Sequence, residues 1–151
     1  MRISAKADYA VRAAVEMAAA GEEPMKGERI AEAQDIPLQF LEHILLELKH
    51  ARLVRAKRGA HGGYWLDRPP EEITLANVIR AVEGPLANIQ DQAPEQTKYP
   101  GHAERLSEVW VAVRSSLRRV LENVTIADLR DGKIPADVLA LTKDEGAWVT
   151  R

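Results

Sequence analysis

The segment from Leu48 to Leu66, LKHARLVRAKRGAHGGYWL, constrains the fold of this 151-residue chain more than any other. Residues 53–57 and 63–67 alternate apolar with polar side chains, and the RGAHG between them supplies the glycines that a hairpin tip needs. Just before this segment, apolar residues recur at helical intervals. A helix followed at once by a two-stranded hairpin is therefore predicted, which is the arrangement of a winged helix.

Positive charge is concentrated in the same part of the chain. Against one acidic residue, Asp67, the range 49–68 holds six basic ones: Lys49, Arg52, Arg55, Lys57, Arg58 and Arg68. The whole chain has a net charge of −2, and residues 69–151 carry ten basic and thirteen acidic side chains. A local basic surface binds duplex DNA through counterion release whatever the overall charge of the protein. DNA binding is therefore predicted for the first half only.

Three helices are predicted before the hairpin. Ser4 is expected to cap the first, in which small and apolar residues recur at threes and fours. A short second helix is expected over residues 27–33. After a tight turn, Pro37 is expected at the first position of a third helix, whose buried stripe is Leu41, Ile44, Leu45 and Leu48. Two helices joined by so short a turn form a helix-turn-helix, whose second helix offers its N-terminal residues to the major groove.

The candidate DNA-binding residues lie on the other face of the third helix and at the hairpin tip. Glutamine can bridge adenine, and histidine can donate to guanine. Glu42 could accept a hydrogen bond from cytosine N4 or could only orient a basic neighbour. The glycines around Arg58 permit close approach to a sugar-phosphate edge, although a solvated charge at a turn is the alternative. The full set is Gln39, Phe40, Glu42, His43, Lys57, Arg58, Gly59 and His61.

The second half begins with a helix that is expected to run from its Thr74 cap to about Glu83, where Gly84 and Pro85 end it. Residues 87–101, ANIQDQAPEQTKYPG, are interpreted as a loop of poor intrinsic order and as the boundary between the halves. The predicted organisation has four parts. They are a winged-helix DNA-binding domain (1–86), a loop (87–101), a dimerisation helix with a short C-terminal helix (102–132) and a tail with little signal (133–151).

A long amphipathic helix is predicted after the loop. Its apolar residues recur at threes and fours over some six turns as far as Val124, and 22 helical residues would span roughly 33 Å. Such a helix needs a partner, most simply a second copy of itself. The expected dimerisation residues are Leu106, Val109, Trp110, Val113, Leu117, Val120 and Leu121. Thr125 and Asp128 are interpreted as a capping pair for a final short helix that ends at Gly132.

Several function classes are excluded or weakened by what the sequence lacks. The chain has no cysteine, which removes disulfides, thiolate metal sites and cysteine nucleophiles. The N-terminal residues lack the continuous apolar stretch of a signal peptide, so a cytoplasmic protein is expected. No serine lies in a G-x-S-x-G elbow and no phosphate-binding glycine loop is present, so the chain is not predicted to be an enzyme. His102, Glu104 and Glu108 form only a weak metal-binding pattern.

Four ordered motifs resemble the Rrf-two family of bacterial winged-helix regulators: MRISAKADYA, IPLQFLEHIL, RGAHGGYWL and ITLANVIRAVEGPL. The match covers residues 1–86 well and continues more loosely over 106–129. The resemblance implies a homodimeric transcription factor in which residues matching Gln39, Phe40, Glu42 and His43 enter the major groove and Arg58 probes the minor groove. Phe40 stands where the family usually has tyrosine.

The same resemblance raises the question of an iron-sulfur cluster. Many family members hold a cluster through three cysteines in the loop that corresponds to residues 87–102 here, some with a further ligand at a position that Asp8 matches. Because this chain has no cysteine, no cofactor is predicted. We expect a homodimeric repressor that binds a palindromic operator and responds to a small molecule or a partner protein. The alternatives are a winged-helix protein-interaction module and a metal-responsive regulator.

Overall fold

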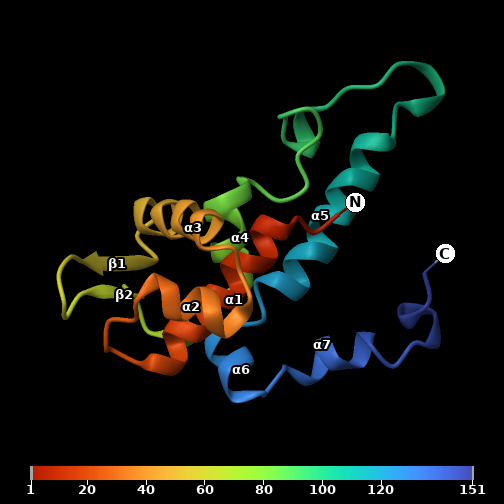
Figure 1. The fold of residues 1–151 in the computed structure, drawn as a ribbon. Helices are drawn as coiled ribbons and strands as arrows, with labels where there is room; N and C mark the ends of the chain where they lie inside the picture. Colours follow the sequence, from red (N-terminus) through yellow and green to blue (C-terminus); the bar gives the residue numbers. More distant parts are fainter. Residues whose placement is uncertain (1, 151) are drawn as a thin grey trace.

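The computed structural model describes residues 2–150 and is mainly helical with one small antiparallel sheet (Figure 1), as the sequence predicts. The helices and strands are α1 (Ala5–Ala20), α2 (Gly27–Gln34), α3 (Leu38–His50), β1 (Val54–Lys57), β2 (Gly63–Leu66), α4 (Leu75–Glu83), α5 (Leu106–Leu121), α6 (Ile126–Asp131) and α7 (Ala136–Leu141). Within residues 2–150, no helix has the length and apolar character to cross a membrane.

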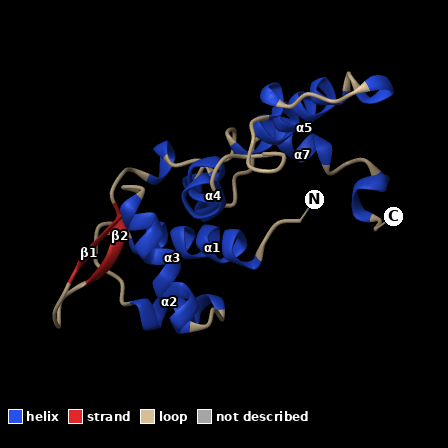
Figure 2. Cartoon of the chain, turned by 90° about the horizontal axis from the view of Figure 1, so that it is seen from above, coloured by secondary structure: helices blue, strands red, loops and turns tan. Residues whose placement is uncertain are grey.

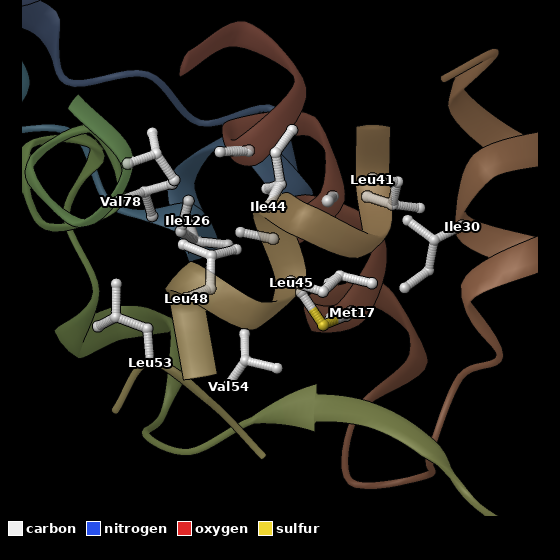
Figure 3. Close-up of a cluster of buried hydrophobic side chains, with 14 of the residues drawn as sticks. Met17, Ile30, Leu41, Ile44, Leu45, Leu48, Leu53, Val54, Val78 and Ile126 are labelled. Carbon is white, nitrogen blue, oxygen red and sulfur yellow. The ribbon is translucent and has the colours of Figure 1, made fainter. Parts of the chain in front are cut away.

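The core is built around α1, which contacts α2, α3, α4 and α6. Three alanines, Ala10, Ala13 and Ala14, are at most 1% exposed, and their small side chains let the neighbouring helices approach closely. Figure 3 shows the larger side chains that fill the space around them, among them Met17, Ile30, Leu41, Ile44, Leu45, Leu48 and Ile126. The predicted buried stripe of the third helix is confirmed.

Local capping fixes where the helices begin, largely as expected. The Ser4 hydroxyl accepts a hydrogen bond from the backbone N–H of Ala7 at 3.0 Å. Thr74 and Thr125 each begin a reciprocal capping box, with Asn77 and Asp128 as the respective partners. Pro37 differs slightly from the prediction, because it is the residue before α3 rather than the first helical residue.

The turn between α2 and α3 is held from α1. Asp35 adopts the left-handed conformation, with φ 51°, and the next residue donates its N–H to the carbonyl of Ala31. Arg12 donates to the carbonyl of Gln34 at 2.8 Å, and the Gln34 amide donates to Glu16 at 2.5 Å. The orientation of α3 is therefore set both by its buried stripe and by polar contacts that reach the turn.

The hairpin of β1 and β2 is the predicted wing. Its register pairs Val54 with Leu66 at one end and Lys57 with Gly63 at the other. A short bridge between Met25 and Tyr64, with two backbone hydrogen bonds of 2.9 Å, attaches the hairpin to the segment before α2. The wing is consequently anchored to the body along β2, while its tip extends beyond the helices (Figure 1).

The helix α5 is shorter than predicted. It has 16 residues instead of about 22 and ends at Leu121. The reason is that Val124, which continues the apolar period, is buried in the body of the protein and accepts a hydrogen bond from Leu75 N–H at 2.9 Å. The chain then returns to the core, where Ile126 of α6 is fully buried. The last apolar residues of the pattern therefore serve the core and not the helix.

The segment 87–101 has no long helix or strand, but it makes specific contacts with α5. A 3-10 turn at Pro94–Gln96 lies against the helix, and Pro94 is buried. Glu95 pairs with Arg114 at 2.7 Å, and the indole N–H of Trp110 donates to the hydroxyl of Tyr99 at 3.1 Å. The tail, which gave little signal in the sequence, contains α7 and a final 3-10 turn at Glu145–Trp148.

Candidate DNA-binding surface

The four candidate residues at the start of α3 all lie on its exposed side. Gln39, Glu42 and His43 are exposed, because the opposite side of the helix is occupied by the buried stripe. Phe40 is 41% exposed, and the rest of its ring packs edge-on against Tyr9 of α1, with ring centroids 5.6 Å apart. The polar side chains are therefore available to a ligand, and the aromatic residue also helps to seat the helix.

The packing beneath Phe40 extends to a cation. The guanidinium of Arg12 lies 4.7 Å from the centre of the Tyr9 ring and pairs with Asp8 at 2.9 Å. A cation over an aromatic face is stabilising, and the Tyr9 ring that Arg12 contacts is the ring against which Phe40 packs. The same Arg12 holds the turn before α3, so one side chain supports both the turn and the exposed start of that helix.

The candidate residues of the wing gather at its tip. Lys57, Arg58, Gly59 and His61 are all exposed. Gly59 has φ 106°, a conformation that favours glycine, and its carbonyl accepts a hydrogen bond from the Lys26 ammonium at 2.6 Å. The tip is therefore shaped by glycine and tied to the body by a further lysine, while its two basic side chains remain free to meet an anionic ligand.

The exposed side of α3, from Glu42 to Lys49, and the wing tip border one hollow. This hollow of about 500 Å³ lies between them, and its lining includes Glu42, Leu46 and Lys49 from α3 and Lys57 and Arg58 from the wing. Of the eight candidate residues, four line this hollow and four do not: Glu42, Lys57, Arg58 and Gly59 line it, whereas Gln39, Phe40, His43 and His61 lie outside its lining. Figure 2 shows the wing strands at one end of the molecule, with α3 beside them, and α5 at the other end.

Eight residues that line this hollow were not among the candidates from the sequence, including Lys26, Leu46, Lys49 and the acidic Glu28. Lys49 and Leu46 follow Glu42 and His43 at helical spacing along the exposed side of α3, so the period alone could have included them. Lys26 also lines the hollow, but it reaches the surface only because the wing folds back toward α2. Nothing in its local sequence indicates that contact.

Not all of the positive charge of the segment faces the hollow. Arg55 lies on the exposed side of β1, 3.6 Å from Asp67 and 6.0 Å from the centre of the Trp65 ring. Its charge is partly balanced by that carboxylate. The basic residues that border the hollow with no acidic partner among the ion pairs of residues 2–150 are Lys26, Lys49, Lys57 and Arg58.

The seven predicted dimerisation residues fall into two groups on α5. A groove of about 630 Å³ between α5, the end of α4 and the start of the chain is lined from α5 by Trp110, Val113, Leu117 and Leu121. Leu106, Val109 and Val120 lie outside this lining, and Val109 is 52% exposed. No residue of α5, which lies entirely within the described range 2–150, is fully buried.

The residues present do not fit an iron-sulfur cluster. The chain has no cysteine, and the carboxylate of Asp8 is engaged by Arg12. Among residues 2–150, no three of the side chains His, Asp and Glu converge in a way that could hold a metal ion. Glu108, part of the weak metal pattern, is bound bidentately by Arg105 at 3.1 and 2.8 Å, and the hydrogen bonds from Arg105 lower its pKa.

Comparison with known proteins agrees with this geometry. Residues 3–132 match the family Rrf2, described as an iron-dependent transcriptional regulator. Rv1287 of Mycobacterium tuberculosis, named as an HTH-type transcriptional regulator, is 48% identical over 145 residues, which are 95% of this chain and 90% of the relative. The HTH-type transcriptional regulator CymR of Bacillus subtilis is 34% identical over 130 residues, which are 85% of this chain and 89% of the relative.

Solved structures give the same result. The structure of B. subtilis CymR, titled as the global cysteine regulator, superposes with a TM-score of 0.73 at 32% identity and covers 87% of this chain and 97% of its own. IscR of T. potens superposes with a TM-score of 0.69 at 30% identity, over 100% of this chain and 93% of its own. Fold and surface thus define a winged-helix DNA-binding transcriptional regulator and not an enzyme. The chain belongs to the Rrf2 family, as the sequence motifs indicated.

Proposed function

We propose that this regulator binds a palindromic operator as a homodimer and represses transcription there. The observation that carries the proposal is the hollow between the exposed side of α3 and the basic wing tip, which Lys26, Lys49, Lys57 and Arg58 border. In this arrangement Gln39, Glu42 and His43 read base edges in the major groove, and Arg58 enters the adjacent minor groove. Phe40 offers an apolar contact of the kind made to a thymine methyl group.

The proposed dimer forms through α5. Val109, Ser116 and Val120 are spaced by seven and four residues and so share one side of the helix, at whose edge Val113 also lines the groove. The side next to it faces the groove of the same chain. A symmetric pairing of two α5 helices would cover Val109 and would hold two copies of α3 on one face of the DNA. Repression is the simplest outcome of a dimer bound over a promoter.

The experiment that tests the proposal is selection of bound fragments from a random DNA pool. The expected result is an enriched palindrome whose half-sites are separated by a multiple of about 10 base pairs. Insertion of half a helical turn between the half-sites should abolish tight binding, because the rigid dimer can no longer reach both. Tight binding after that insertion would contradict the dimer arrangement.

Replacement of single reading residues should separate the two kinds of contact. Gln39→Ala is expected to cost about 1 to 3 kcal/mol on the selected operator and to relax the preference at one base position. Arg58→Ala should weaken binding most where the minor groove is narrow. Both are measured by binding titrations on a panel of single-base operator variants. Arg55→Ala is the control, because Arg55 lies beside Asp67. A base preference unchanged in both variants would remove these residues from the reading surface.

Salt dependence distinguishes DNA binding from a protein-interaction role for the wing. If four basic residues, Lys26, Lys49, Lys57 and Arg58, contact phosphates, the logarithm of the affinity should fall with the logarithm of salt concentration with a slope of about −3.6 per subunit. Filter binding or fluorescence anisotropy at several salt concentrations measures this slope. A slope near zero would indicate contacts that are not electrostatic and would favour the protein-interaction alternative.

The signal in this proposal does not involve a cluster. The absence of cysteine removes the thiolate ligands of a cluster, and the proposed signal is a small molecule or a partner protein. The segment 87–101 and its contacts with α5 are the part of the protein in which such a signal would act, since it lies between the proposed dimerisation helix and α4. Transcription from an operator-linked promoter, measured in cells with and without this regulator, would distinguish repression from activation.

A further inference from the structure

Three arginines meet where the end of α4 lies beside α5. Arg80 comes from the last turn of α4, and Arg114 and Arg118 come from successive turns of α5. Together with Gly84, Pro85 and Leu86 they line an open hollow of about 400 Å³. This hollow lies outside the proposed DNA-binding surface, and none of the arginines was singled out in the sequence.

The arginines outnumber the carboxylates that contact them. Glu95 pairs with Arg114 at 2.7 Å, and Glu122 is shared between Arg80 and Arg118, with Arg118 at 3.7 Å. Three guanidinium groups therefore meet two carboxylates, which leaves one positive charge in excess. Arg118 is the least satisfied of the three, since its single ion pair is long and its side chain is 50% exposed.

The same contacts show which chemistry the hollow accepts. Both resident acidic groups are carboxylates, each bound through one oxygen by guanidinium nitrogens, and arginine is well suited to binding carboxylates. The pKa of Glu95 is lowered by a hydrogen bond to its own backbone and, to a smaller extent, by the hydrogen bond from Arg114. The hydrogen bond from Arg80 lowers the pKa of Glu122. Both carboxylates therefore stay ionised near neutral pH. The neighbouring wall is apolar, because Leu86 and Pro85 form it.

We propose that this hollow is a binding site for a small organic carboxylate, whose acid group binds Arg118 and Arg114 and whose short carbon skeleton lies against Leu86. The volume is within the usual range for small-molecule sites. The Arg114 side chain is only 18% exposed, but its partner Glu95 is 56% exposed, so the carboxylate side of this ion pair is open to solvent and an incoming carboxylate can displace Glu95 from Arg114. If the protein is the regulator proposed above, this displacement would release the 3-10 turn at 94–96 from α5 and so act as its signal.

Isothermal titration calorimetry of the full chain with butyrate and with succinate tests the site without DNA, so its failure is distinct from a failure of the proposed regulation. Saturable binding is expected, at constant ionic strength maintained with chloride. Glu95→Gln should bind about fivefold more tightly, because the competing carboxylate is gone. Arg118→Gln should bind at least about tenfold more weakly, since it loses a charged hydrogen bond.

The matched control is Arg119→Gln, which removes the same charge from the neighbouring, exposed position of α5 outside the hollow. Its affinity should equal that of the parent. If the Arg118 and Arg119 variants bound the carboxylate equally weakly, the loss would reflect general charge attraction, and the proposed site would be overturned. The site would also be overturned if neither the parent nor the Glu95 variant bound butyrate or succinate. The same holds if the protein bound inorganic phosphate but neither of these two carboxylates. Circular dichroism checks that each variant is folded. If Arg118→Gln does not fold, the affinity of the Glu95→Gln variant still tests the site.

Discussion

Val109→Glu is expected to convert the protein to a monomer and to weaken operator binding by about 100-fold or more. Val109 is 52% exposed in the single chain, so a glutamate there should leave the fold of the monomer intact. In the proposed symmetric dimer the substitution occurs twice at one interface, where two like charges would be desolvated side by side. The loss of affinity follows because a monomer reaches only one half-site at a time.

Two measurements check this expectation. Analytical ultracentrifugation gives the oligomeric state, and a titration of the selected operator gives the affinity. Ser115→Glu is the matched control, since it adds the same charge to an exposed position of α5 that is not on the side of Val109 and Val120. A Val109 variant that remains dimeric, with the control also dimeric, would show that the copies associate through another surface.

Gly63→Ala is expected to detach the wing from the body and to lower the free energy of unfolding by about 2 to 4 kcal/mol. Gly63 has φ 148°, and a β-carbon there would lie 2.7 Å from the carbonyl carbon and oxygen of Met25. These are backbone atoms of the bridge that joins Met25 to Tyr64, so they cannot rotate away. The hairpin must shift, and with it Lys57 and Arg58. Operator binding should therefore fall by at least about tenfold.

Gly59→Ala separates the effect of crowding from that of backbone conformation. Gly59 also has a positive φ, 106°, but a β-carbon there would meet no heavy atom within 4 Å. Only the conformational strain remains, so the expected loss is about 1 kcal/mol. Urea denaturation of both variants measures the difference. Equal losses in the two variants would mean that the bridge to Met25 contributes little to the position of the wing.

Local elements of this fold could be predicted from the sequence because short-range physics determines them. Ser4, Thr74 and Thr125 cap their helices through bonds to residues three positions away. The stripe of α3 and the glycines of the hairpin tip follow from spacing alone. The exposed candidates on α3 and the wing were found for the same reason, since the side of an element that is not apolar remains at the surface.

The length of α5 could not be predicted, because the same apolar pattern serves two different environments. Val124 continues the helical period, yet its carbonyl bonds to Leu75 and its side chain enters the core. A periodic apolar pattern predicts that a side chain is buried, but it does not predict which element the side chain packs against. The tail helix was missed for the opposite reason, since its exposed residues Leu139 and Leu141 give no clear stripe to detect.

The sequence by itself determined the winged helix-turn-helix, the local concentration of positive charge and the absence of thiolate ligands, since each depends on residue type and short spacing. Only the tertiary structure decided which residues far apart in the chain share a surface. Lys26 reaches the wing tip, Arg12 supports the start of α3, and three arginines of α4 and α5 meet at one hollow. Such meetings depend on the packing of whole helices around α1, which no local pattern encodes.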